Sequence, residues 1–249
     1  MTKTSQARSF DAAAAAYGAN RPSYPPALLG AVEELAGFGL GGARVADIGA
    51  GTGLGTALLH AHGARVTAVE PGDGMAEEFR RRLPEVPLVR GDGNHLPLRS
   101  HSMDLLTYAQ AWHWTDTGRS VPEARRVLRP GGALALWWND SDPTVSWIGE
   151  QDARMRKFFG AAETPRDARV RFRATLPDGL SFDTRLLPWS RRVPLDVHLG
   201  NVGSYSDFLV ADPEAVGGFL ARERELLSEI FPDGVVEETY VVSLAVARH

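Results

Sequence analysis

The sequence predicts an α/β fold in which a mostly parallel sheet has helices on both faces. Apolar, strand-like runs alternate with segments of helical spacing between residues 44 and 138. A glycine-rich turn joins the first of these strands to the helix after it, and strand-like segments return late in the chain. We therefore expect about five parallel strands and two later ones, in a single domain that spans residues 1–249.

The composition is that of a globular protein and excludes several classes of function. Hydrophobic residues make up 43% and charged residues 23%, and with a net charge of −4 nothing suggests the basic face that a nucleic acid would need. The absence of cysteine excludes disulfides, cysteine-ligated zinc and thiol catalysis. No run of about 18 apolar residues occurs, and residues 1–10 lack an apolar signal-peptide segment. We expect a cytoplasmic enzyme with no membrane partner.

The first elements are two helices joined by an extended connector. Ser9 can cap a helix that continues to Tyr17 and stops at Gly18. Residues 20–26 are expected to be extended, because residues that precede proline avoid the α region. The two prolines at the end of this connector suit the first turn of a second helix. Residues 1–36 should therefore form a helical cover.

The glycine-rich turn follows a strand expected at residues 44–48. Asp47 stands near the end of this strand, and Gly49, Gly51 and Gly53 follow at alternate positions before a helical segment. Glycine allows positive φ and lets a ligand approach the backbone closely. The start of the helix presents unpaired N–H groups to a polar or anionic ligand. The turn therefore predicts a ligand site at the end of this strand.

The glycine spacing argues against a dinucleotide and points to another cofactor. The dinucleotide fingerprint Gly-x-Gly-x-x-Gly needs glycine where this chain has Leu54 or Thr56. These two residues oppose a nicotinamide oxidoreductase, which stays a distant alternative. The pattern Asp-x-Gly-x-Gly-x-Gly resembles the first motif of class I S-adenosylmethionine (SAM)-dependent methyltransferases. This resemblance implies that Asp47 and the three glycines contribute to a SAM site.

The connector before the second helix carries a further resemblance. Tyr17 followed by Arg21-Pro22-Ser23-Tyr24-Pro25 looks like the N-terminal segment of small-molecule methyltransferases similar to the trans-aconitate methyltransferase group. In that group the segment folds over the cofactor, so the resemblance implies that Tyr17 and Arg21 face the amino-acid end of SAM. From the residues alone, Arg21 as a surface charge and Tyr17 as a core aromatic remain equally open.

The next two strands, at residues 65–69 and 86–90, each end beside an acidic residue. Glu70 lies 21 residues after Gly49, where an acid can accept both ribose hydroxyls of a bound nucleoside. The resemblance implies that Met75 lies beside the adenine, that Asp92 accepts its amino group and that the Gly93 N–H reaches a ring nitrogen. Relatives often have Ala-Glu after the aspartate, where this chain has Gly-Asn. A core methionine and an exposed turn aspartate are the structural alternatives.

A fourth strand is expected at residues 102–108, followed by a helix that opens at Ser120 and a fifth strand at residues 133–138. The phrase Leu-Arg-Pro-Gly-Gly, which ends at Gly132, precedes this last strand and is a mark of the methyltransferase family. Together the resemblances cover residues 9–140. They imply a Rossmann-like, seven-stranded sheet that is completed by an antiparallel late strand pair.

The rest of the chain is less regular. Residues 145–159 and 213–230 have helical spacing, residues 181–187 and 189–194 resemble strands, and residues 237–248 alternate as a last strand. Insertions after the fifth strand, over residues 139–212, are expected to form a lid over the substrate.

His113 is the candidate general base, because it follows the fourth strand and histidine titrates near neutral pH. It can instead only shape the pocket. Ala109 and Gln110, just before it, are candidates for holding the methionine end of SAM. The expected order of strands and loops puts a further set of side chains near the methyl acceptor, although these residues can instead be part of the hydrophobic core. These substrate candidates are Trp112, Trp114, Trp138, Asn139, Trp147, His198 and Tyr205.

The sequence therefore predicts a methyltransferase that acts on a small organic acceptor with an apolar part, as a monomer or homodimer without a metal. Two alternatives use the same cofactor site. One is an intramolecular cyclase that consumes SAM and releases methylthioadenosine. The other is a SAM-binding module without catalysis.

Overall fold

The computed structural model describes residues 20–161, 172 and 176–249, so the helix expected at residues 10–17 lies outside the described residues. Seven strands form one sheet in the order β3-β2-β1-β4-β5-β7-β6. The strands are β1 (Arg44–Ile48), β2 (Arg65–Glu70), β3 (Leu88–Arg90), β4 (Met103–Ala109), β5 (Leu128–Ser141), β6 (Asp183–Pro194) and β7 (Val235–Arg248).

The predicted mostly parallel sheet is confirmed. β1 pairs in parallel with β2 and β4, β2 with β3, and β4 with β5. β7 inserts antiparallel between β5 and β6. The middle strands are buried on both faces, which is why β1 and β4 appear in the sequence as continuous apolar runs rather than alternating ones.

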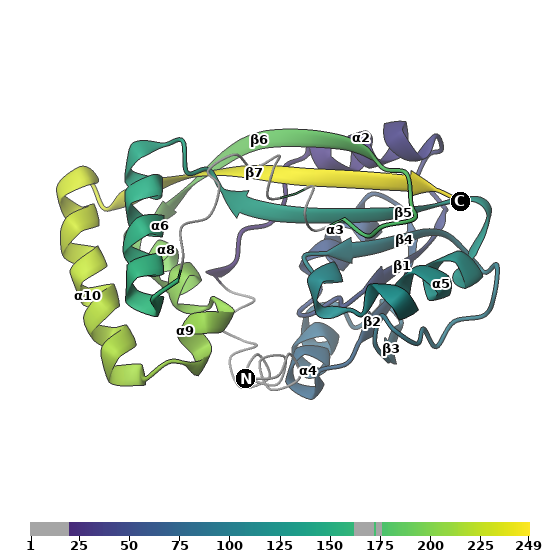
Figure 1. Cartoon of the computed structure of the whole chain (residues 1–249), viewed down its shortest axis with the longest axis horizontal. Coiled ribbons are helices and arrows are strands. Elements are labelled where there is room, and N and C mark those ends of the chain that lie inside the picture. Colours follow the sequence, from purple (N-terminus) through teal and green to yellow (C-terminus); the bar gives the residue numbers. More distant parts are fainter. Residues whose placement is uncertain (1–19, 162–171, 173–175) are drawn as a thin grey trace.

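Helices cover both faces of this sheet (Figure 1). None of the helices within the described ranges is long and apolar enough to cross a bilayer. The helices are α2 (Ala27–Ala36), α3 (Leu54–Ala61), α4 (Asp73–Arg82), the 3₁₀ turn η1 (Trp112–Trp114), α5 (Thr117–Val127), α6 (Ser146–Phe159), α8 (Leu195–Gly203), α9 (Ser206–Val210) and α10 (Pro213–Ile230).

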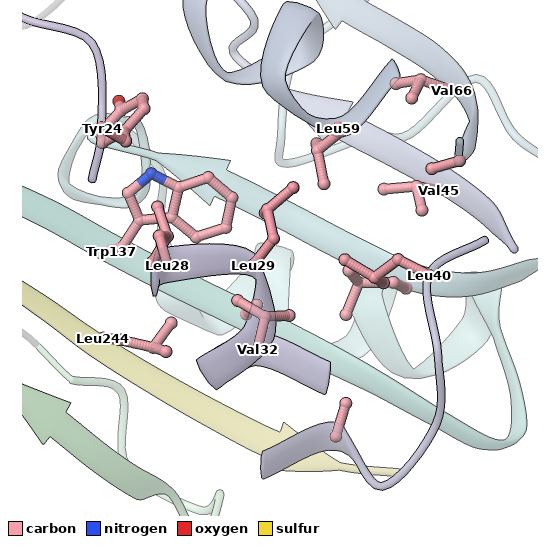
Figure 2. Close-up of a cluster of buried hydrophobic side chains, with 14 of the residues drawn as sticks. Tyr24, Leu28, Leu29, Val32, Leu40, Val45, Leu59, Val66, Trp137 and Leu244 are labelled. Atoms are coloured by element: carbon pink, nitrogen blue, oxygen red, sulfur yellow. The ribbon is translucent and has the colours of Figure 1, made fainter. Parts of the chain in front are cut away.

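One hydrophobic core lies between α2, α3 and the sheet, and Figure 2 shows its centre. Leu28 and Val32 of α2 are fully buried and face Trp137 of β5 and Leu244 of β7. Tyr24, just before α2, meets the Trp137 indole edge to face, with ring centroids 5.9 Å apart. Such a pair adds about 1 kcal/mol beyond its buried area. The core therefore anchors the chain on the N-terminal side of α2 to the middle of the sheet.

Beyond the ends of the shorter strands, β5, β6 and β7 continue to a group of four helices, α6, α8, α9 and α10 (Figure 1). We call this group the cap. Leu195 and Leu199 of α8 pack with Leu227 of α10 and Val236 of β7 in a separate apolar cluster. The expected lid over residues 139–212 thus omits α10, which packs against α8. That the cap closes over a substrate stays a prediction.

Several expected elements have different bounds in the structure, and three of these differences have a clear physical reason. The two strands expected at residues 181–194 are one strand, because β6 is the edge strand of the sheet and an edge tolerates Pro188. The helix expected to open at Ser120 begins at Thr117, capped by Asp116, whose side chain accepts from the Gly118 N–H. The fifth strand reaches Ser141, because β7 pairs with it from Ala133 to Ser141.

Candidate functional site

A cavity of about 330 Å³ opens at the carboxyl ends of β1, β2 and β4. Ligands bind at this edge in open parallel sheets, and the volume is typical of a small-molecule site. The residues that line it are Arg21, Pro22, Tyr24, Ile48, Gly49, Ala50, Gly51, Thr52, Leu54, Gly55, Glu70, Pro71, Met75, Asp92, Gly93, Asn94, Tyr108, Ala109, Gln110, Ala111, Trp114 and Thr115.

The glycine-rich turn forms one wall of the cavity. Gly49 has a φ of 66°, and a Cβ atom there would lie 2.6 Å from the Cβ of Ala111. Gly51 has a φ of 56°, but a Cβ atom there would meet no protein atom within 4 Å. Its bare backbone therefore leaves room for a ligand inside the cavity. Gly53 is not among the lining residues and packs against Leu83.

Asp47 does not line the cavity but lies buried behind the glycine-rich turn. Its carboxylate is fully buried and accepts hydrogen bonds from the hydroxyls of Thr56 (2.6 Å) and Thr107 (2.8 Å). Burial raises the pKa of Asp47 to about 6, against the opposing effect of these two bonds. Asp47 thus links β1 to β4 and to the start of α3, and any role toward a ligand is indirect.

Glu70 joins the loops that follow the first two strands. Its Oε2 accepts from the backbone N–H of Gly51 (2.8 Å), and its Oε1 accepts from the N–H of Gly72 (2.7 Å). The side chain is largely buried but still lines the cavity. Because each carboxylate oxygen has two lone pairs, Glu70 can hold both loops and still accept hydrogen bonds from a diol.

Asp92 and its neighbours form the cavity wall after β3. The Asp92 Oδ1 accepts from the N–H groups of Asn94 (2.7 Å) and His95 (3.1 Å), which fixes a tight turn. Within the described part of the chain, its Oδ2 accepts no hydrogen bond. The Asn94 Oδ1 accepts from the backbone of Asp116 (2.7 Å), so its amide NH₂ group is the end left for a ligand. Met75, from α4, lines the same cavity and is buried.

Gln110 turns the chain sharply at the end of β4. It has a φ of 57°, in the left-handed region that side chains seldom adopt, and its N–H donates to the carbonyl of Trp137 (2.8 Å). A residue held this way costs about 1 kcal/mol and is often found at functional sites. The turn brings Ala109, Gln110 and Ala111 together along the cavity wall.

Residues 20–24, which we call the strap, contribute Arg21, Pro22 and Tyr24 to the wall of the cavity. Arg21 lines the cavity, donates to the carbonyl of Ser204 (3.3 Å), and its guanidinium lies over the ring of Tyr205, 4.7 Å from the centroid. Tyr205 therefore lies next to Arg21 rather than lining the cavity itself. Tyr17 lies outside the described residues.

The predicted general base lies beside the cavity rather than in it. His113 is exposed on η1, and its Nδ1 accepts from the indole N–H of Trp138 at 3.4 Å. Trp114 lines the cavity and packs on the His113 ring, with centroids 4.8 Å apart. Trp138 also meets Phe172 edge to face. Trp112, by contrast, is buried against Tyr108 in the core.

The other substrate candidates lie in or near the cap. Asn139 accepts from the indole of Trp189 (2.9 Å) and donates to the carbonyl of Ser23 (3.3 Å), which belongs to the strap. Trp147 packs edge to face on His198 and is part of the cap's apolar cluster. His198 is buried. None of these three lines the cavity, so a direct role in binding the acceptor stays a prediction.

The charges of the cavity are divided between its two sides. Among the described residues that line it, the strap contributes one cation, Arg21, whereas the sheet contributes two carboxylates, Glu70 and Asp92. Five polar lining residues were not assigned from the sequence: Tyr24, Thr52, Asn94, Tyr108 and Thr115. All five lie within three residues of a predicted residue, so their position in the chain was the available signal.

No group of three or more histidine, aspartate or glutamate side chains among the described residues is arranged to hold a metal ion. The groups that the cavity presents to a ligand are therefore backbone N–H and C=O groups, carboxylates, one guanidinium and aromatic rings.

Comparisons with known proteins find relatives of this chain among the methyltransferases. A model of the methyltransferase domain matches residues 46–136. An uncharacterized methyltransferase of Mycobacterium tuberculosis is 35% identical over 221 residues, which cover 88% of this chain and 86% of that protein. The structure of a proposed type II methyltransferase from Anaeromyxobacter dehalogenans has a TM-score of 0.69 and 27% identity, over 92% of this chain and 97% of that one.

A third similarity concerns the fold alone. A phosphoethanolamine N-methyltransferase of Haemonchus contortus, solved in complex with phosphomonomethylethanolamine and S-adenosylhomocysteine, has a TM-score of 0.53 and 16% identity. The match covers 96% of this chain and 57% of that one.

The buried Asp47 predicts a specific pH dependence of stability. The folded pKa of Asp47 is about 6 and lies above the ordinary value of 3.8. Burying this carboxyl therefore costs almost no stability below pH 4, and the cost grows as the pH rises from about 4 to 6 and then stays constant. Asp47→Asn removes this cost. Relative to the wild type, the free energy of unfolding of the variant, measured with urea, should therefore rise by up to about 3 kcal/mol between pH 4 and pH 7.

Asp104 is the matched control, because its pKa is shifted the other way. Burial would raise it, but hydrogen bonds from Arg44 and Arg129 outweigh burial and lower the pKa to about 2. Asp104→Asn should therefore destabilise the protein at pH 7, and the loss should shrink as the pH falls from 4 toward 2. Parallel pH curves for wild type and Asp47→Asn would contradict the assignment to Asp47.

Proposed function

Because this chain belongs to the SAM-dependent methyltransferases, we propose that it transfers the methyl group of SAM to a small organic acceptor. When bound, SAM supplies a methyl group on a positively charged sulfonium, which is already a strong alkyl donor. The protein then has to hold the donor, align a nucleophile, keep water out and, for some acceptors, remove a proton. These tasks need neither a metal nor a covalent intermediate on the protein.

The division of charge in the cavity is the observation that supports SAM as the ligand. SAM has a carboxylate at its methionine end, a ribose diol in the middle and an amino group on adenine. Arg21 can pair with the carboxylate, Glu70 can accept from the diol, and Asp92 can accept from the adenine amino group. Gly51 has no side chain and no protein atom where its Cβ would stand, which leaves space in the cavity for the middle of the SAM molecule.

The mouth of the cavity supports an acceptor with an apolar or aromatic part. Trp114 faces the cavity, and His113, Trp138 and Phe172 continue the aromatic surface away from it. Aromatic walls exclude water and stack on flat or apolar groups. We propose His113 as the group that takes a proton from the acceptor, with its Nδ1 lone pair turned from Trp138 to the acceptor during turnover.

Product analysis tests the proposed reaction. The purified protein is incubated with SAM and a fraction of small organic molecules, and the products are measured by mass spectrometry. Methyl transfer yields S-adenosylhomocysteine together with an acceptor that has gained one methyl group. Methylthioadenosine instead of S-adenosylhomocysteine would replace the proposal with an intramolecular cyclase. Binding of SAM without either product would make the chain a binding module.

Gly51→Ala should weaken cofactor binding more than it weakens the fold. The added methyl group would meet no protein atom and would stand at the cavity wall, where we propose that SAM binds. We expect the Kd for S-adenosylhomocysteine, measured by calorimetry, to rise about tenfold or more. The positive φ should also cost about 1 kcal/mol of stability.

Gly42→Ala is the control for that backbone cost. Gly42 has a φ of 75°, a Cβ atom there would also meet nothing within 4 Å, and it precedes β1 at the opposite edge of the sheet. Its substitution should cost similar stability and leave the Kd unchanged. Equal Kd values for Gly51→Ala and wild type would refute the proposed position of the ligand.

His113→Ala should slow turnover without weakening the binding of S-adenosylhomocysteine. Loss of a general base lowers kcat by about a hundredfold in typical enzymes. The comparison is His60→Ala, an exposed histidine of α3 that pairs with Glu85 away from the cavity. With an identified acceptor, an unchanged kcat for His113→Ala would remove this residue from the mechanism.

A further inference from the structure

The strap carries Arg21, Pro22 and Tyr24 into the cavity wall but has no regular secondary structure after residue 20. Pro22 lacks an N–H group, and Pro25 follows directly after the strap, so the backbone here cannot form a continuous ladder of hydrogen bonds. Besides the packing of Tyr24 on Trp137, the contacts that hold such a segment are hydrogen bonds from other groups to its carbonyls.

Two side chains from the sheet bind the carbonyls on either side of Arg21 and Pro22. The Nη2 of Arg191, on β6, donates to the carbonyl of Asn20 at 3.0 Å. The Nδ2 of Asn139, on β5, donates to the carbonyl of Ser23 at 3.3 Å. The pair therefore holds both ends of the short stretch that presents the guanidinium of Arg21 to the cavity.

Asn139 is itself held in one orientation. Its Oδ1 accepts from the indole N–H of Trp189 at 2.9 Å, which leaves the Nδ2 to face the strap. The Trp189 ring is stacked on Tyr240 with centroids 5.3 Å apart, and Asn139 is 8% exposed. The amide donor is thus oriented before any ligand binds, so little ordering remains to be done on binding.

Arg191 is oriented by a buried chain of charged and polar groups that continues into the cap. Its Nε donates to Glu238, which is 2% exposed and whose other oxygen meets the Nδ1 of His198 at 2.7 Å. The His198 Nε2 in turn faces the Oε1 of Gln151, whose amide donates to Glu223 of α10. Removing one member of such a buried set is costly, so the set keeps Arg191 in place.

We propose that Arg191 and Asn139 are positioning residues for the methyl donor, which hold the strap so that Arg21 meets the carboxylate at the amino-acid end. This inference rests on the proposed function, because it takes SAM as the ligand of the cavity. It assigns Asn139 a role through the strap rather than the direct acceptor contact expected from its place in the sequence. It also couples the cap to the cofactor, since the chain that orients Arg191 runs through α6, α8 and α10.

The test compares two ligands that differ only at the amino-acid end of the nucleoside. S-Adenosylhomocysteine carries the amino and carboxylate groups, whereas methylthioadenosine lacks them. For Arg191→Met and for Asn139→Ala, we expect the calorimetric Kd for S-adenosylhomocysteine to rise about tenfold or more. The Kd for methylthioadenosine should stay within about twofold of wild type. A general loosening of the fold would weaken both ligands alike.

Arg191→Lys separates the strap from the buried ion pair. Arg191 uses two different nitrogens for Glu238 and for the Asn20 carbonyl, and a lysine has only one, which the charge of Glu238 should hold. We therefore expect near wild-type thermal stability together with weakened S-adenosylhomocysteine binding. This variant keeps the proposal testable if Arg191→Met does not fold.

Arg185→Met is the matched control. Arg185 is on the same strand and the same face as Arg191, and it pairs with Glu34 of α2 through two hydrogen bonds of 2.6 and 2.9 Å. Its hydrogen bonds go to Glu34 rather than to the strap, so binding of both ligands should be unchanged. If folded Arg191 and Asn139 variants bind S-adenosylhomocysteine as wild type does, or lose both ligands equally, the positioning role is wrong and the methyltransferase proposal stands. A wild-type protein that binds neither ligand would overturn both.

Discussion

The cavity depends on one carboxylate at the end of β2. Glu70 accepts hydrogen bonds from the backbone of Gly51 and of Gly72, so a single side chain holds the loops that follow β1 and β2. The glycine turn needs such a support, because its glycines have no side chains to pack and their backbone is conformationally free. Parallel pairing of β1 with β2 and β4 then places the remaining strand ends at the same edge.

The second half of the chain completes the site from the opposite side. β5, β6 and β7 extend past the shorter strands and carry the cap (Figure 1). Asn139 of β5 and Arg191 of β6 reach the strap, and Ser204, which follows α8 in the cap, accepts a hydrogen bond from Arg21. The cavity is therefore built from two kinds of structure. The sheet supplies carboxylates and bare backbone, and the strap supplies the cation.

Much of the fold and the sheet side of the cavity could be predicted from the sequence, because their signals are local. A strand end followed by glycines, and an acid after the next strand, place Gly51 and Glu70 without knowledge of distant contacts. The cap side could not be predicted this way. Asn139 and His198 were expected near the acceptor, but their partners lie 116 and 40 residues away in the chain. The role of Trp112 could not be read from the sequence, because Trp112 and Trp114 stand two residues apart in one aromatic segment. In the structure Trp112 is a core residue, whereas Trp114 lines the cavity.

A crystal structure of the protein with S-adenosylhomocysteine tests the central claim most directly, namely that opposite sides of one cavity recognise opposite ends of the same nucleoside. The account predicts the adenine amino group on Asp92, the ribose hydroxyls on Glu70 and the carboxylate on Arg21. A nucleoside bound elsewhere, or bound in this cavity with its carboxylate pointing away from the strap, would contradict the account.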